Sequence, residues 1–181
     1  LNLTTTIGGA YLAETDAISV TQASVSDELR LSSGGDLALV NTTISGNAQL
    51  NVTGTASITS LTAASIDLQA SGTTTLQSVT SRGAVQIIVS GAGHDLMLNN
   101  LSALNEGAGQ TVTLNVAGSL TGGEANTDTP LDIRAGRLII TAGSVGTHGN
   151  ALDLNVDTLA LTSSAGHAYL SDADALTLAT A

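Results

Sequence analysis

The 181-residue sequence contains no cysteine, tryptophan, phenylalanine or lysine. Without cysteine the chain forms no disulfide and offers no thiolate as a nucleophile or metal ligand. Four arginines stand against fifteen acidic residues, and the formal net charge of −11 excludes the cationic surface that nucleic-acid binding requires. The same charge disfavours an anionic membrane surface. Two tyrosines are the only aromatic residues, so the core must be built from aliphatic side chains.

Long hydrophobic segments are also missing. The longest apolar run lies around residues 85–89, far below the roughly 18 residues that a membrane-spanning helix needs. We therefore predict no membrane insertion. No basic segment followed by an apolar stretch begins at Leu1, so no signal peptide is visible. We interpret residues 1–181 as a single segment, an internal fragment of a longer repeat array.

Apolar and polar residues alternate in short runs along the whole chain. Examples are LRL at 29–31, VTLNV at 112–116 and LDLNV at 152–156. A period of two predicts strands with one buried face, and the clusters of Gly, Ser, Thr, Asn and Asp between the runs predict turns. Glycine interrupts the windows in which apolar residues keep helical spacing. The predicted fold class is therefore all-β, without helices.

Two segments of the chain are copies of one motif. Residues 8–20 align without a gap with residues 166–178 at an offset of 158, and Tyr11 falls on Tyr169. Repetition over so long a distance indicates an array of smaller structural units.

A finer period of about 20 residues lies beneath this offset. The VTL segment at 112–114, the LDI segment at 131–133 and the LDL segment at 152–154 follow one another at nearly this spacing. Units of this length, made of short strands and glycine-rich turns, are typical of a parallel β-helix in which each unit is one coil. We predict about eight to nine coils, stacked about 4.8 Å apart. The side chains expected inside are those of Leu114, Ile133, Leu154 and Leu178.

Several motifs resemble repeats of very large bacterial exoproteins of the filamentous-haemagglutinin type. They are GNALDLNVDTLAL at 149–161, AYLSDADALTL at 168–178, and PLDIRAGRLIIT at 130–141 followed by GSVG at 143–146. The resemblance implies a right-handed parallel β-helix in a secreted or surface-displayed bacterial adhesin. It also implies neighbouring repeats of the same polypeptide as partners, with host, cell-surface or glycan ligands bound through other regions.

Acidic pairs in the two motif copies are candidate calcium ligands. Glu14 and Asp16 correspond to Asp172 and Asp174, and such carboxylates offer the oxygen ligands that Ca²⁺ prefers. The alternative is a recurring solvated turn whose acids keep a long rod soluble. Paired carboxylates also occur in glycoside hydrolases, but a pair that recurs at one motif position favours the structural interpretation, and we expect no enzyme activity and no cofactor other than calcium.

Histidines and threonines give two further candidate sites. His148 and His167 are about one coil apart and would hold a metal with Asp153 if they lay on adjacent coils; exposed turn residues are the plainer interpretation. Threonines at 53–55 and 73–75 would give the flat array of an ice-binding solenoid, but the series ends at the GHD segment at 93–95. The preference of β-branched residues for strands also explains them.

The composition, the repeat and the absence of a catalytic constellation favour a structural function. We expect a rigid spacer in a large secreted or surface-displayed adhesin, which holds a distal binding region away from the cell. The alternative is a carbohydrate-binding or polysaccharide-degrading β-helix.

Overall fold

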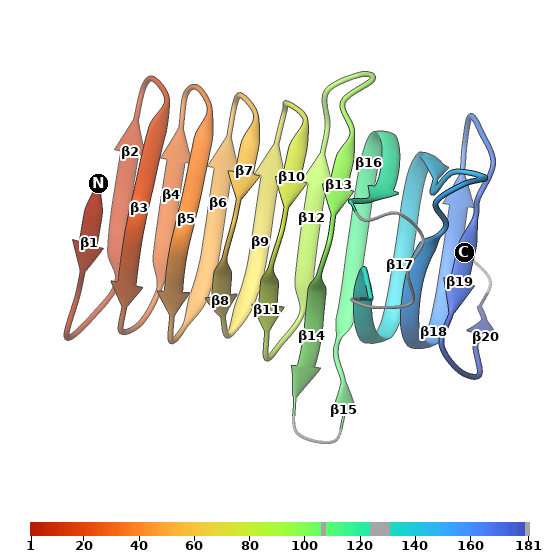
Figure 1. Cartoon of the computed structure of the whole chain (residues 1–181). Coiled ribbons are helices and arrows are strands. Elements are labelled where there is room, and N and C mark those ends of the chain that lie inside the picture. Colours follow the sequence, from red (N-terminus) through yellow and green to blue (C-terminus); the bar gives the residue numbers. More distant parts are fainter. Residues whose placement is uncertain (106–107, 124–130, 180–181) are drawn as a thin grey trace.

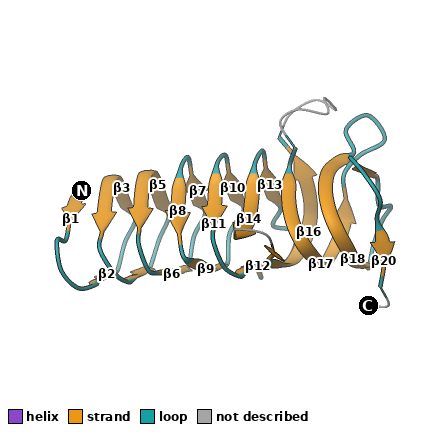
Figure 2. Ribbon diagram, turned by 90° about the horizontal axis from the view of Figure 1, so that it is seen from below, coloured by secondary structure: helices purple, strands orange, loops and turns teal. Residues whose placement is uncertain are grey.

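The computed structural model describes residues 1–105, 108–123 and 131–179, and in these residues it is all-β. The strands stack in parallel as a β-solenoid of about nine turns, which confirms the predicted fold class. The coils follow one another from the N-terminus to the C-terminus (Figures 1 and 2). No helix of membrane-spanning length and apolarity occurs in the described part of the chain.

The described residues contain twenty strands, of which all but β15 belong to the parallel sheets of the solenoid. In chain order they are β1 (Asn2–Thr4), β2 (Ala10–Glu14), β3 (Ile18–Val25), β4 (Leu29–Ser33), β5 (Leu37–Ile44), β6 (Asn47–Val52), β7 (Ala56–Ile58), β8 (Leu61–Ala63), β9 (Ser65–Ala70), β10 (Thr74–Leu76), β11 (Val79–Ser81), β12 (Val85–Val89), β13 (Leu96–Leu98), β14 (Leu101–Asn105), β15 (Ala108–Gly109), β16 (Thr111–Gly122), β17 (Ile133–Val145), β18 (Leu152–Ser163), β19 (Leu170–Asp172) and β20 (Thr177–Leu178).

The strands line up in three parallel sheets that run the length of the rod. The first sheet contains β2, β4, β6, β9 and β12 and continues through β16, β17, β18 and β20. The second begins in the first half of β3 and continues through β5, β7, β10 and β13 to the ends of β16 and β17. The third begins with β1 and the second half of β3 and continues through β5, β8, β11, β14, β17, β18 and β19.

The interior consists of aliphatic ladders that continue from coil to coil. In β4, the side chains of Leu29 and Leu31 are buried while Arg30 between them is exposed, as the alternating sequence predicts. Leu31 stacks on Leu50 of the next coil. A single coil cannot bury its own apolar face, so the stacking of neighbours provides the core. The first-sheet ladder runs Leu31, Leu50, Leu68, Ile87, Leu114, Ile140 and Leu161.

Coil length is nearly constant in the N-terminal part of the rod. The equivalent corner residues Asp36 and Thr55 are 19 residues apart. In the next coil, Asn47 pairs with Ser65, and these two are 18 residues apart. Both steps are close to the predicted period.

Later coils are longer than the sequence period predicted. Leu114 pairs with Ile140 and not with the 131–133 segment, so the predicted step from 112–114 to 131–133 is wrong. In the same pair of coils, Ser119 and Ser144 are paired and 25 residues apart. The predicted step from 131–133 to 152–154 is confirmed, because Ile133 pairs with Leu154. The additional residues are inserted at the corners and protrude from the coil, for example in the β14–β15 hairpin, while the interior ladder continues (Figure 1).

Three of the four predicted interior residues are confirmed. Leu114, Ile133 and Leu154 are at most 1% exposed. Leu178 is 75% exposed, and its predicted burial is wrong. It pairs with Leu159 on one side, but no further described coil stacks on its other side.

The two motif copies occupy different places in the coil. Leu12 pairs with Leu31 in the first sheet, whereas Leu170, which corresponds to it at the offset of 158, pairs with Leu152 in the third. The shift arises because the coils between positions 85 and 145 are longer than those at the N-terminal end. Similarity of sequence therefore does not give the two copies equivalent positions.

Aspartates at the corners hydrogen-bond to the backbone of the next coil. Oδ1 of Asp36 accepts a hydrogen bond from the Thr55 amide at 2.8 Å, and Oδ1 of Asp95 accepts one from the Ser119 amide at 2.7 Å. A carboxylate that accepts backbone N–H bonds is stabilised in its charged form. The bond from Thr55 accordingly lowers the pKa of Asp36 below its ordinary value of 3.8.

This interaction predicts a pH-dependent contribution of Asp36 to stability. Because the folded pKa is lowered, the stabilisation is present above the unfolded pKa and is lost as the pH falls through the folded pKa. We expect the difference in Tm between the wild type and Asp36→Ala to be largest near neutral pH and to shrink below about pH 4. Thermal unfolding followed by circular dichroism at a series of pH values measures it. A difference that stays constant with pH would contradict this role.

Candidate functional site

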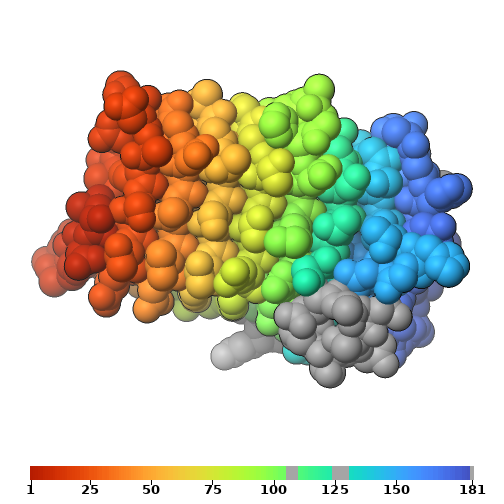
Figure 3. Space-filling view, turned by 45° about the horizontal axis from the view of Figure 1, so that its top comes forward, coloured from red at the N-terminus to blue at the C-terminus, as the bar shows by residue number. Residues whose placement is uncertain are grey.

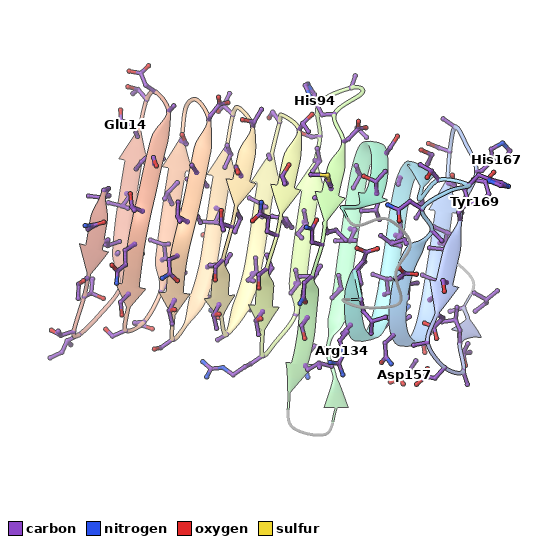
Figure 4. The ribbon with its side chains drawn as sticks, viewed as in Figure 1. Glu14, His94, Arg134, Asp157, His167 and Tyr169 are labelled. Carbon is purple, nitrogen blue, oxygen red and sulfur yellow. The ribbon has the colours of Figure 1, made fainter. Side chains whose placement is uncertain are left out.

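The four predicted calcium ligands lie in two pairs at opposite ends of the rod. Glu14 closes β2 at the N-terminal end, and Asp172 closes β19 near the C-terminal end; Figure 4 shows Glu14 far from Tyr169, the neighbour of β19. Oε1 of Glu14 accepts hydrogen bonds from the amides of Thr15 at 2.9 Å and Asp16 at 3.5 Å. These bonds are those of a local turn, and calcium binding at this pair stays a prediction.

Asp172 and Asp174 form a turn of the same kind. Oδ1 of Asp172 accepts a hydrogen bond from the Asp174 amide at 3.2 Å, and Oδ2 accepts one from the Val156 amide of the previous coil at 3.3 Å. Asp172 and the buried Asp153 line a hollow of about 380 Å³. Both oxygens of Asp172 thus already hold backbone groups in place.

His148 and His167 lie around Tyr169, but Asp153 does not join them in a metal-binding group. The ring centroids of His148 and His167 lie 5.9 and 6.0 Å from that of Tyr169. Among the residues that the structure describes, no three His, Cys, Asp or Glu side chains come together in a way that would hold a metal ion. His94 is in another corner, with Nδ1 3.4 Å from Oγ1 of Thr73.

The predicted threonine array is short. Ala56 pairs with Thr74, which makes the preceding residues, Thr55 and Thr73, neighbours on adjacent coils. Aspartates hold the equivalent position in the flanking coils: Asp36 precedes Leu37, which pairs with Ala56, and Asp95 precedes Leu96, which pairs with Thr74. The array therefore covers two coils.

A longer row of hydroxyl groups, which the sequence analysis missed, lies on the third sheet. Its members share one outward position and pair from coil to coil without interruption. The row consists of Thr4, Ser24, Thr43, Thr62, Thr80 and Ser102.

Two shallow hollows adjoin on the outward face of the first sheet. One, of about 430 Å³, is lined by Tyr11, Arg30 and Gln49 among others, and the second, of about 270 Å³, by Gln69 and neighbouring residues. Both hollows share a lining of Ser32 and Asn51, so they form one depression across several coils. We call it the first-sheet depression.

Register places the side chains of this depression in two rows. Strand pairing puts Arg30 next to Tyr11 in one row, and Gln49 next to Arg30. In a parallel sheet, outward residues two apart along a strand lie side by side on one face. The second row runs Ala13, Ser32, Asn51, Gln69 and Ile88.

An ion pair stands at the N-terminal end of the depression. Nε of Arg30 lies 2.7 Å from Oε1 of Glu28, and this hydrogen bond raises the pKa of the Arg30 guanidinium. Oη of Tyr11 donates to Oε2 of the same carboxylate at 3.2 Å, and Cζ of Arg30 lies 5.9 Å from the Tyr11 ring centroid. The three side chains hold one another, while the Tyr11 residue remains 69% exposed.

The sequence does contain a sign of this cluster, namely outward side chains that follow one another at the spacing of one coil. Tyr11 and Arg30 are one coil apart, and Gln49 follows one coil later. An outward aromatic, a cation and an amide at coil spacing predict one continuous surface, provided the register is known.

A scan against family models finds no match to this chain, and searches of curated proteins and of solved structures find no significant match.

Proposed function

We propose that this chain is a rigid structural spacer of a large secreted or surface-displayed bacterial adhesin. It is not an enzyme in this proposal, and its partners are neighbouring repeats of the same polypeptide. Host, cell-surface or glycan ligands would bind through other regions. The observation that carries the proposal is the uninterrupted stack of about nine turns.

The physics of the stack supports stiffness. Each interior side chain, such as Leu50 or Leu68, is held between equivalent residues of the coils on either side. Bending the rod would open these contacts, and close-packed interiors resist such gaps. About nine turns at about 4.8 Å each give a rod roughly 40 Å long. Figure 3 shows the coils as successive bands along this rod.

The test is to remove one coil and measure the length of the rod. Leu37 pairs with Ala56, so deleting residues 37–55 brings Ala56 into the place of Leu37. We expect this variant to remain folded and to be shorter by about 4.8 Å in small-angle X-ray scattering.

A matched deletion provides the control. Removing residues 37–54, one residue fewer, puts Thr55 in the place of Leu37 and turns the following apolar side chains outward. We expect this variant to lose its cooperative unfolding transition. Scattering typical of a flexible chain for the wild type, or an unchanged length after deletion of the whole coil, would overturn the spacer proposal.

The second candidate function is carbohydrate binding, with or without degradation. The specific observation in its favour is the first-sheet depression, with its amide and hydroxyl side chains and an exposed tyrosine.

A further inference from the structure

The first-sheet depression combines groups that recognise sugars. Asn51 and Gln69 present amides that both donate and accept hydrogen bonds, and Ser32 adds a hydroxyl group. All three belong to exposed residues on adjacent coils of one row. Sugar hydroxyls also donate and accept, so a row of such side chains matches them without requiring charge.

Tyr11 supplies the apolar part of the surface. Its residue is 69% exposed, and its hydroxyl group is held by Glu28 at 3.2 Å. An aromatic ring with a fixed polar edge offers a flat face at low cost in conformational entropy. The C–H face of a pyranose ring packs against such a surface.

The charge of the depression selects against acidic polymers. Arg30 is the cation that lines it, and Arg30 is paired with Glu28 at 2.7 Å. Asp67 lies in the same row as Gln49 and adds a negative charge. In a chain of net charge −11, a polyanion such as a uronate or a sulfated glycan would be repelled.

The spacing of the rows fits an extended polymer. Outward residues repeat about every 4.8 Å along the rod axis, close to the length of one hexose in an extended glycan. From Tyr11 to Ile88 the depression crosses five coils, or about 19 Å. An extended chain along the axis would therefore place successive sugars over successive coils.

We propose that the first-sheet depression binds a neutral linear polysaccharide that lies along the rod axis, with one sugar stacked on Tyr11 and the following sugars hydrogen-bonded to Gln49, Asn51 and Gln69. This proposal specifies the second candidate function and places a glycan site on this segment, in addition to ligands bound through other regions. It does not depend on the spacer function.

The experiment uses the whole 181-residue chain. Binding is screened on an array that holds neutral linear glucans, mannans and galactans beside uronate and sulfated polymers. Calorimetry with neutral oligosaccharides of increasing length then measures affinity. We expect affinity to rise with length up to about four or five sugars, because that length fills the depression.

Variants of exposed residues locate the site. We expect Tyr11→Ala to weaken binding about tenfold or more, and Asn51→Ala to weaken it severalfold. The matched control is Thr62→Ala, an exposed outward residue of the third sheet, which should bind as the wild type does. Should Tyr11→Ala change the melting temperature, Asn51→Ala carries the test, because loss of this exposed side chain leaves the core and the strand pairing of Asn51 intact.

Three results would overturn the proposal. They are the absence of binding to any neutral linear glycan, binding confined to polyanions, and a loss of affinity in Thr62→Ala as large as in Tyr11→Ala and Asn51→Ala. None of these results bears on the length and stiffness measured by scattering, so failure of the glycan proposal is distinguishable from failure of the spacer proposal.

Discussion

Replacing Leu154 with aspartate should lower the free energy of unfolding by about 3–5 kcal/mol. Leu154 is completely buried and pairs with Ile133 in the previous coil and Asp172 in the next. The new carboxylate would have an aliphatic neighbour on one side and a second acid on the other. A buried charge without a partner is among the most destabilising changes in a protein.

Urea unfolding followed by circular dichroism measures the effect. The matched control is Asn155→Asp at the neighbouring position of β18, which is only partly buried; it adds the same charge and should change stability by less than about 0.5 kcal/mol. Equal stabilities for the two variants would show that Leu154 is not in the interior.

Replacing Gly72 with alanine should cost about 1–3 kcal/mol. Gly35, Gly54 and Gly72 follow one another at one corner on successive coils, joined by backbone hydrogen bonds of 3.1 and 2.9 Å. A Cβ on Gly72 would lie 2.6 Å from the backbone carbon and oxygen of Gly54. The neighbouring coil cannot withdraw without breaking its own hydrogen bonds, so the clash persists.

The same substitution at Gly149 tests this explanation. A Cβ there would meet no atom within 4 Å, and we expect Gly149→Ala to leave the melting temperature nearly unchanged. A loss of stability in Gly149→Ala as large as in Gly72→Ala would point to the general preference of turns for glycine instead of the close approach of two coils.

The alternating sequence was sufficient to predict the strands and much of the core. Leu114, Ile133 and Leu154 each stand in a run of period two, and the requirement that such a run bury one face holds in any β structure. The alternating pattern around Leu178 was not sufficient to predict its burial, because a residue of an interior ladder is covered only when a coil stacks on both sides of it. The motif copy at 166–178 gave no sign of that difference.

Register was the part that could not be predicted from the sequence. The interior ladders fix which residues stack, but residues inserted at corners leave the ladders intact and lengthen the coil, so that Ser119 pairs with Ser144. A constant period therefore misplaces Leu114 relative to Ile140. The first-sheet depression was missed although its coils are regular, because its side chains are seen to form one surface only when the coils are aligned residue by residue.

The direction of the backbone hydrogen bonds has a mechanical consequence. These bonds connect one coil to the next and point along the rod, so tension applied to the two ends acts on them directly. Ile18 and Leu37 are paired on successive coils. When such a coil detaches, about 4.8 Å of rod is replaced by about 65 Å of extended chain. Under pulling, we expect the molecule to lengthen by detaching its outermost coils one after another, each releasing many times its own length.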